Sequence, residues 1–141
     1  ELVGTVRAFH REFRKSMPQR IQEVVENVVK GYNCTADCDY YFGPSPLIND
    51  NEELNKISQE AARKILGRDC LVPLTKSMGA EDFSVYMEHI PGVYGYLGIR
   101  NKVKGIECIA HHPSFDVDES VLYTGAAIYA QFAVDYLESN G

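Results

Sequence analysis

The Gly-Pro-Ser-Pro run at residues 43–46 most limits how this chain can fold. Proline fixes φ and lacks a backbone N–H, so such a run predicts a break between two structured segments. Before the break, residues 2–9 alternate as in a strand, residues 12–30 have a helical period, and residues 34–42 again favour a strand. The order strand, helix, strand is half of a small α+β unit rather than a complete domain.

The predicted helix at residues 12–30 has its apolar side chains on one face. They are Phe13, Met17, Ile21, Val24, Val25, Val28 and Val29. Pro18 interrupts the pattern, so we expect either a kink or a helix that begins near Pro18 with Ser16 as its cap. Gly31 is the predicted stop.

A second helix is predicted after the break. Asp50 and Glu53 have the spacing of a capping box, with a carboxylate in place of the usual hydroxyl. The helix closes at Gly67, and a short strand at residues 71–74 follows. Its predicted buried face is Leu54, Ile57, Ala61, Ile65 and Leu66.

The rest of the chain continues to alternate helices with strands. Residues 81–89 favour a short helix, residues 93–97 a strand, and residues 119–137 a long final helix that Asp116 or Asp118 caps. The side chains predicted to be buried on the final helix are Val121, Leu122, Ala126, Tyr129, Phe132, Ala133, Tyr136 and Leu137. The whole pattern indicates an α/β (α+β) fold class.

The composition limits the functions that this chain can have. At 141 residues it has the length of one domain or of two small lobes. A net charge of −6 argues against a nucleic-acid partner, and no basic run suggests a membrane surface. We find no leader and expect a cytoplasmic protein, unless a leader has been removed. The chain opens directly as a strand, so we expect it to be part of something longer.

The cysteines favour reduced thiols. Cys34, Cys38, Cys70 and Cys108 form no C-x-x-C pair and no spacing typical of a zinc site or a disulfide framework. We expect these four thiols to be mostly buried.

Two adjacent histidines lie just before the final helix. Pro113 disfavours helical backbone at His112, so we expect an extended loop in which His111 and His112 point in opposite directions. One imidazole could then face a cleft and bind a metal. The alternative is a pair of ordinary loop histidines, which residue type alone favours because a metal site needs several convergent ligands.

Three charged residues could also carry chemistry. Glu81 or Asp82 could bind a metal, a substrate amine or a histidine, but chemistry alone favours a helix N-cap, which needs only Asp82 or Ser84. Arg7 could clamp a carboxylate through two hydrogen bonds, although most arginines only lie on the surface. The chain has no G-x-S-x-G, phosphate loop or H-E-x-x-H motif, so nothing supports serine catalysis or nucleotide binding.

Several motifs occur in an order that resembles a known family. They are Gly-Thr-Val-Arg-Ala-Phe at residues 4–9, Ser-Met-Gly-Ala-Glu-Asp-Phe-Ser at 77–84, Ile-Pro-Gly-Val at 90–93, His-His-Pro-Ser-Phe-Asp-Val-Asp-Glu at 111–119, and Gly-Ala-Ala at 125–127. Together they resemble the C-terminal portion of an M20-type metallopeptidase. The most similar group is the amidohydrolases that cleave N-acyl amino acids, such as hippurate hydrolase and the auxin-conjugate hydrolases.

The resemblance implies a two-domain, zinc-peptidase-like enzyme with two divalent metal ions, commonly zinc or manganese, bridged by a water that attacks the amide. By motif position, His111 resembles a metal ligand. Residues 1–43 would be the C-terminal half of a ferredoxin-like lid or dimerisation domain, and residues 44–141 the C-terminal part of the catalytic domain. The residues expected to contact substrate are Arg7, Met78, Gly79, Glu81, Asp82 and His112.

The remaining metal ligands and the general-base glutamate of such enzymes belong to an N-terminal half that has no counterpart here. We therefore expect no catalytic residue within this chain, an inactive isolated chain, and no metal or one weakly bound ion. The leading interpretation is part of a metal-dependent amidohydrolase acting on small N-acylated amino acids or dipeptides, and forming a homo-oligomer. The alternatives are a non-catalytic dimerisation or interaction module and an unrelated small α+β domain.

Overall fold

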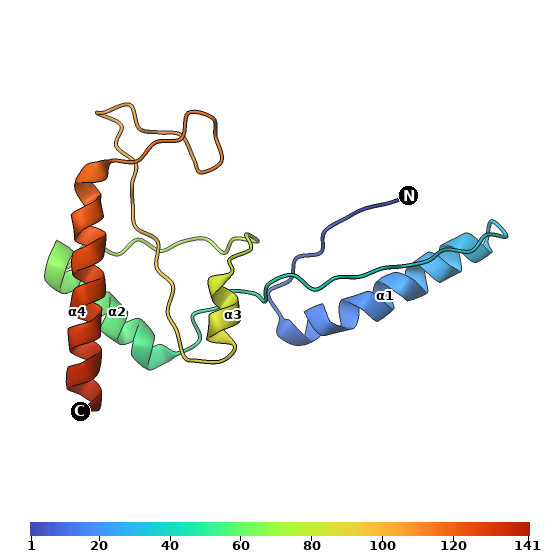
Figure 1. The fold of residues 1–141 in the computed structure, drawn as a ribbon, viewed down its shortest axis with the longest axis horizontal. Coiled ribbons are helices and arrows are strands. Elements are labelled where there is room, and N and C mark those ends of the chain that lie inside the picture. Colours follow the sequence, from blue (N-terminus) through green and yellow to red (C-terminus); the bar gives the residue numbers. More distant parts are fainter. The chain divides into compact units, whose positions relative to one another are not determined.

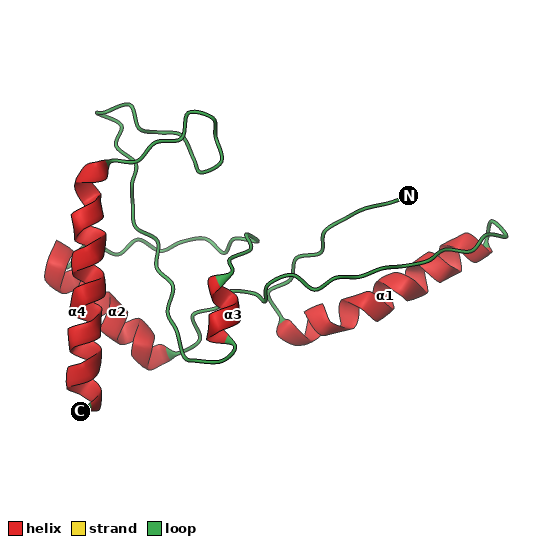
Figure 2. Cartoon of the chain, in the orientation of Figure 1, coloured by secondary structure: helices red, strands yellow, loops and turns green.

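The computed structural model describes residues 1–141, and its regular structure is entirely helical (Figures 1 and 2). The helices are α1 (Arg11–Lys30), α2 (Glu52–Leu66), α3 (Phe83–Met87) and α4 (Leu122–Asn140), with the 3-10 turn η1 (Glu119–Val121) leading into α4. The chain divides into two units. The first contains Glu1–Ile48 and Thr75–Ile90, and the second contains Asn49–Leu74 and Pro91–Gly141.

In the first unit, α1 confirms the helix predicted at residues 12–30. Pro18 lies inside the helix, so a start near Pro18 with Ser16 as cap is wrong. The helix begins after His10, whose backbone is extended, and Gly31 follows its last residue as predicted. No side chain of α1 is buried, and Val24 and Val28 of its apolar face are exposed.

None of the four segments predicted as strands, residues 2–9, 34–42, 71–74 and 93–97, forms one. The α/β class and the ferredoxin-like lid are therefore not confirmed. The regular secondary structure of this chain is helical. The physical reason is that a strand exists only when a neighbouring backbone satisfies its N–H and C=O groups. The one pairing of this kind is an isolated antiparallel bridge between Asn101 and Ile106.

In the second unit, α2 packs against α4. The core of this contact is small, because Leu54 and Ala61 are the buried apolar residues of the chain. Asn51, not the predicted Asp50, caps α2: its side chain accepts a hydrogen bond from the Leu54 N–H at 2.9 Å. Gly67 ends the helix with a φ of +92°, as predicted for a glycine stop.

The buried face predicted for α4 is wrong. Leu122, Tyr129 and Leu137 are exposed, whereas Thr124 is buried. Polar groups occupy the face toward α2, where Asp135 accepts hydrogen bonds from Lys64 at 2.6 Å and from Gln131 at 2.7 Å. Of the side chains that the sequence assigns to the buried side of α4, Val121 and Phe132 are only half-buried.

Two further expectations concern cysteines and membranes. All four cysteines are free thiols, as predicted, but Cys34 and Cys38 are exposed and the other two are half-buried, so the expectation of burial is wrong.

No helix is both long enough and apolar enough to cross a lipid bilayer. The boundary predicted at residue 43 concerns the domains of a longer protein and stays a prediction.

Candidate functional site

The histidine loop turns sharply at His111, whose φ is +71°. The His112 N–H donates to the Ile109 carbonyl at 3.2 Å, closing a turn over residues 109–112. A positive φ at the third residue and not at the second is typical of a type II turn. His111 is therefore in left-handed backbone, and the expectation of an extended chain is wrong for this residue.

The two imidazoles of the loop differ in their hydrogen bonds. His112 Nδ1 accepts from the Ser114 N–H at 3.0 Å, so in the neutral ring its other nitrogen, Nε2, carries the proton. In that tautomer the ring's one lone pair, on Nδ1, is already engaged by the Ser114 N–H and is not free for a metal. The exposed ring of His111 takes part in no hydrogen bond or ion pair, which leaves it free to act as a ligand.

The loop is closed at its base by Asn101 and Asp118. Asn101 pairs with Ile106 through two backbone hydrogen bonds of 2.9 Å, and its side-chain Nδ2 donates to Asp118 Oδ2 at 2.5 Å. The Asp118 N–H donates to the Ile99 carbonyl at 3.0 Å. Residues 107–117, which include both histidines, thus leave and return at one point of the second unit.

Asp118 is buried and fully hydrogen-bonded. Besides Asn101, its carboxylate accepts from Lys104 Nζ at 2.5 Å, from Ser120 Oγ at 2.7 Å and from the Ser120 N–H at 3.2 Å. The hydrogen bond from Asn101, and then those from Lys104 and Ser120, hold the pKa of the Asp118 carboxyl far below its ordinary value. Asp118 also caps η1, which decides between Asp116 and Asp118.

In the first unit, Arg7 reaches the loop that the sequence singled out. Its guanidinium donates to the Met78 carbonyl at 3.0 Å, and the neighbouring Gly79 N–H donates to Ser77 Oγ at 3.2 Å. Arg7, Met78 and Gly79, three of the residues expected at a substrate pocket, are therefore brought together. Arg7 keeps further N–H groups for a second acceptor, because a guanidinium has five.

Glu81 lies two residues before the short helix α3, and its carboxylate accepts from the Phe83 N–H at 3.3 Å. Its carbonyl accepts from the Ser84 N–H at 3.1 Å and from Ser84 Oγ at 2.7 Å. Asp82 is exposed and makes no cap hydrogen bond. A capping role thus exists here, but the carboxylate that serves it is Glu81 rather than Asp82.

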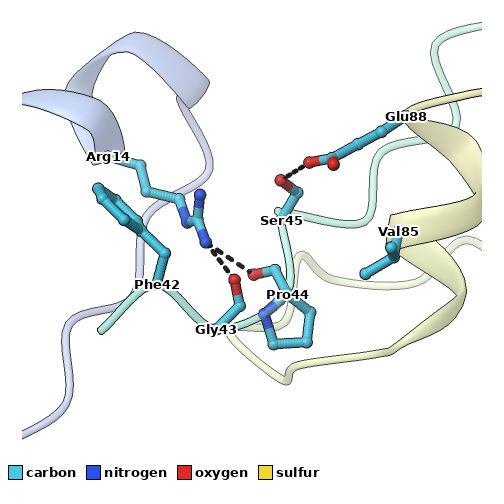
Figure 3. Close-up of a pocket in the computed structure, with 7 residues that line it drawn as sticks. All are labelled: Arg14, Phe42, Gly43, Pro44, Ser45, Val85 and Glu88. Carbon is cyan, nitrogen blue, oxygen red and sulfur yellow. Dashed lines mark hydrogen bonds between the residues drawn. The ribbon is translucent and has the colours of Figure 1, made fainter.

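One open pocket of about 420 Å³ lies in the first unit (Figure 3). Arg14 donates to the carbonyls of Gly43 and Pro44, and its guanidinium lies 4.7 Å from the centre of the Phe42 ring. The Ser45 hydroxyl donates to Glu88. The Arg14 contacts hold the 43–46 run against α1, and the Ser45 contact holds it to the end of α3. The pocket contains none of the predicted site residues. No sequence motif marked Arg14, which was missed.

The metal-ligating residues of the chain do not form a site by themselves. No group of three or more histidine, cysteine, aspartate or glutamate side chains could hold a metal ion. A bound metal normally takes at least three protein ligands, so His111 could supply only one of them. His111 and His112 belong to the second unit, whereas Arg7, Met78, Gly79, Glu81 and Asp82 belong to the first.

Comparison with known proteins identifies the family. The model of peptidase family M20/M25/M40 matches residues 4–135. The chain belongs to this family. It is 33% identical to a probable hydrolase of Synechocystis sp., over 98% of this chain and 35% of the relative. It is 34% identical to N-acetylcysteine deacetylase of Bacillus subtilis, over 99% of this chain and 34% of the relative.

A plant relative is similar to this chain to about the same extent. An IAA-amino acid hydrolase of Arabidopsis thaliana is 35% identical over 96% of this chain and 31% of the relative. The chain therefore spans about a third of the length of the relatives that it matches. The M20 resemblance read from residues 4–9, 77–84 and 111–119 is confirmed.

Proposed function

We propose that the protein to which this chain belongs is a metal-dependent amidohydrolase that cleaves the amide bond of small N-acylated amino acids or dipeptides. The observation that carries the proposal is the family match together with the free imidazole of His111 on a strained turn. Strained residues that surrounding structure holds in place are often functional. The names of two relatives, a deacetylase of N-acetylcysteine and a hydrolase of IAA-amino acids, support this substrate class.

In this proposal His111 is one metal ligand, and the other ligands and the general-base glutamate come from residues outside this chain. A pair of zinc or manganese ions would supply a water of lowered pKa as nucleophile. His112, with Nε2 protonated, donates a hydrogen bond to the substrate carbonyl. Arg7 binds the substrate carboxylate, and residues 78–82 line the same pocket.

The same proposal assigns a place to the segments without regular structure. Residues 1–43 become the second half of a ferredoxin-like lid or dimerisation domain when residues 2–9 and 34–42 pair with strands from the rest of the protein. Residues 44–141 complete the catalytic domain. The isolated chain is then inactive, and the whole enzyme is a homo-oligomer.

The test is a pair of variants in the longer protein, assayed with N-acetyl and N-benzoyl amino acids. His111→Ala is expected to lose one metal ion and most of the activity. His112→Ala is expected to keep both metals and to lose about tenfold in kcat/KM, because one neutral hydrogen bond is worth about 0.5–1.5 kcal/mol. Equal losses from the two variants, or no loss from His111→Ala, would overturn the assignment.

A non-catalytic interaction module is the second candidate. The observation in its favour is the apolar side of α4, where Leu122, Tyr129 and Leu137 are exposed. A protein of this kind would self-associate without binding metal. Metal content of the longer protein separates the two candidates.

A further inference from the structure

Asn101 occupies the junction at which the histidine loop begins and ends. Its backbone N–H and C=O both pair with Ile106, at 2.9 Å, directly before the loop. Its side-chain amide donates to Asp118, directly after the loop, at 2.5 Å. Asn101 therefore contacts both ends of residues 107–117, beside the bonds that Ile99 and Lys104 make to Asp118.

The Asn101 side chain is itself held in place. Its Oδ1 accepts from the Val103 N–H at 3.1 Å and from the Lys104 N–H at 3.3 Å, which leaves Nδ2 pointing to Asp118. The receiving carboxylate is buried and anchored to the start of η1 by Ser120. The pair thus links a tight turn on one side of the loop to a helix start on the other.

We propose that Asn101 and Asp118 form a clamp that sets the position of His111, which makes them positioning residues for the metal site. This inference rests on the proposed function only for the role of His111; the clamp itself is a property of the loop. His111 has a left-handed backbone and no hydrogen bond from its ring, so its position depends on how the loop ends are held. Partners that orient a metal ligand commonly change metal affinity about 10–100-fold when they are lost.

The pair offers an exchange experiment. Asn101→Asp places two carboxylates face to face, and Asp118→Asn places an amide N–H₂ against either the Asn101 amide or the Lys104 and Ser120 donors. Each single variant therefore removes or weakens a hydrogen bond on which the clamp depends. The double variant reverses it: the amide at position 118 donates to the carboxylate at position 101, which can still accept from the Val103 N–H. The net charge of the pair is unchanged.

The control variant is Ser120→Ala. It removes a hydrogen bond of 2.7 Å to the same carboxylate but leaves both ends of the loop joined. If the clamp positions His111, both single variants weaken metal binding by the longer protein about tenfold or more, and the double variant restores it. Ser120→Ala stays within about twofold of the wild type, because the Ser120 hydrogen bond lies within the residues that follow the loop and does not join its two ends.

Two readouts separate this inference from the proposed function. Hydrogen exchange of residues 107–117 in the metal-free longer protein reports the clamp directly, and exchange must rise in each single variant and fall again in the double variant. Zinc affinity of the same proteins reports the consequence for His111. Unchanged exchange in the single variants, or failure of the double variant to restore it, overturns the clamp. A wild type that binds no zinc while the exchange pattern holds overturns the proposed function and the assignment to His111, but not the clamp.

Discussion

From the backbone conformation of His111 we predict how substitutions there change the stability of the protein, independently of catalysis. At a φ of +71°, every residue except glycine is strained, and alanine at such a position costs about 1–2 kcal/mol. Glycine adopts this conformation freely, although it makes the unfolded chain more flexible by about 0.4–1 kcal/mol. His111→Gly is therefore expected to be more stable than His111→Ala by about 1 kcal/mol.

His112 is the matched control for this comparison. It lies in the same loop, but its φ is not positive, so alanine should be favoured there. His112→Ala is expected to be more stable than His112→Gly by about 0.5–1 kcal/mol. The order of stability of the glycine and alanine variants is thus opposite at the two positions. Both variants at a position lose the same imidazole, so the effect of that loss cancels in the comparison.

The assay is thermal unfolding of the four variants in the longer protein, with a chelator present so that metal binding does not contribute. A difference of 1 kcal/mol corresponds to about 2–4 °C in Tm for a domain of 150–250 residues. Asn33, with a φ of +55°, serves as a positive control: Asn33→Gly is again expected to have a higher Tm than Asn33→Ala. A Tm of His111→Ala equal to or above that of His111→Gly would refute both the turn at residues 109–112 and the strain at His111.

Three further predictions concern stability. Asn51→Ala should lower the free energy of unfolding by about 1 kcal/mol, and Asn51→Asp should leave it nearly unchanged because aspartate caps equally well; chemical denaturation measures both. Leu54→Ala should cost about 2–5 kcal/mol, whereas Leu122→Ala on the exposed face of α4 should cost under about 0.5 kcal/mol; a similar cost for both would contradict the observed burial. Asp118 accepts hydrogen bonds from Asn101 and Lys104, and Asp135 accepts them from Lys64 and Gln131; these bonds lower the pKa of both carboxyls below the ordinary 3.8. The two carboxylates therefore stabilise the folded state fully above about pH 5, and this stabilisation is lost as the pH falls below 3.8. Acid unfolding followed by circular dichroism should therefore begin at higher pH in Asp118→Asn than in wild type, and identical midpoints would contradict this.

The helices could be predicted from the sequence because their signals are local. The 3.6-residue period at residues 12–30, the glycine stops at Gly31 and Gly67, and the aspartate before the last helix all act within one or two turns. The choice of Asn51 over Asp50 was missed because both residues are good caps and only the backbone conformation selects between them.

The sequence could not predict the strands and the buried face of α4, because both depend on distant partners. Residues 2–9 and 34–42 have alternating patterns, but the pattern only says which side would be buried once a neighbour is present. The exposed Leu122 and Tyr129 lie on the side of α4 that the period assigns to a core. The role of Asn101 at the base of the histidine loop was not predicted, since no spacing rule relates it to Asp118.

The most direct test of the central claim compares this 141-residue chain with the longer protein to which we propose that it belongs. Metal content and hydrolysis of N-acetyl and N-benzoyl amino acids are measured for both. The account predicts bound divalent metal and activity only in the longer version. Activity in the 141-residue chain alone, or no metal in either version, would contradict it.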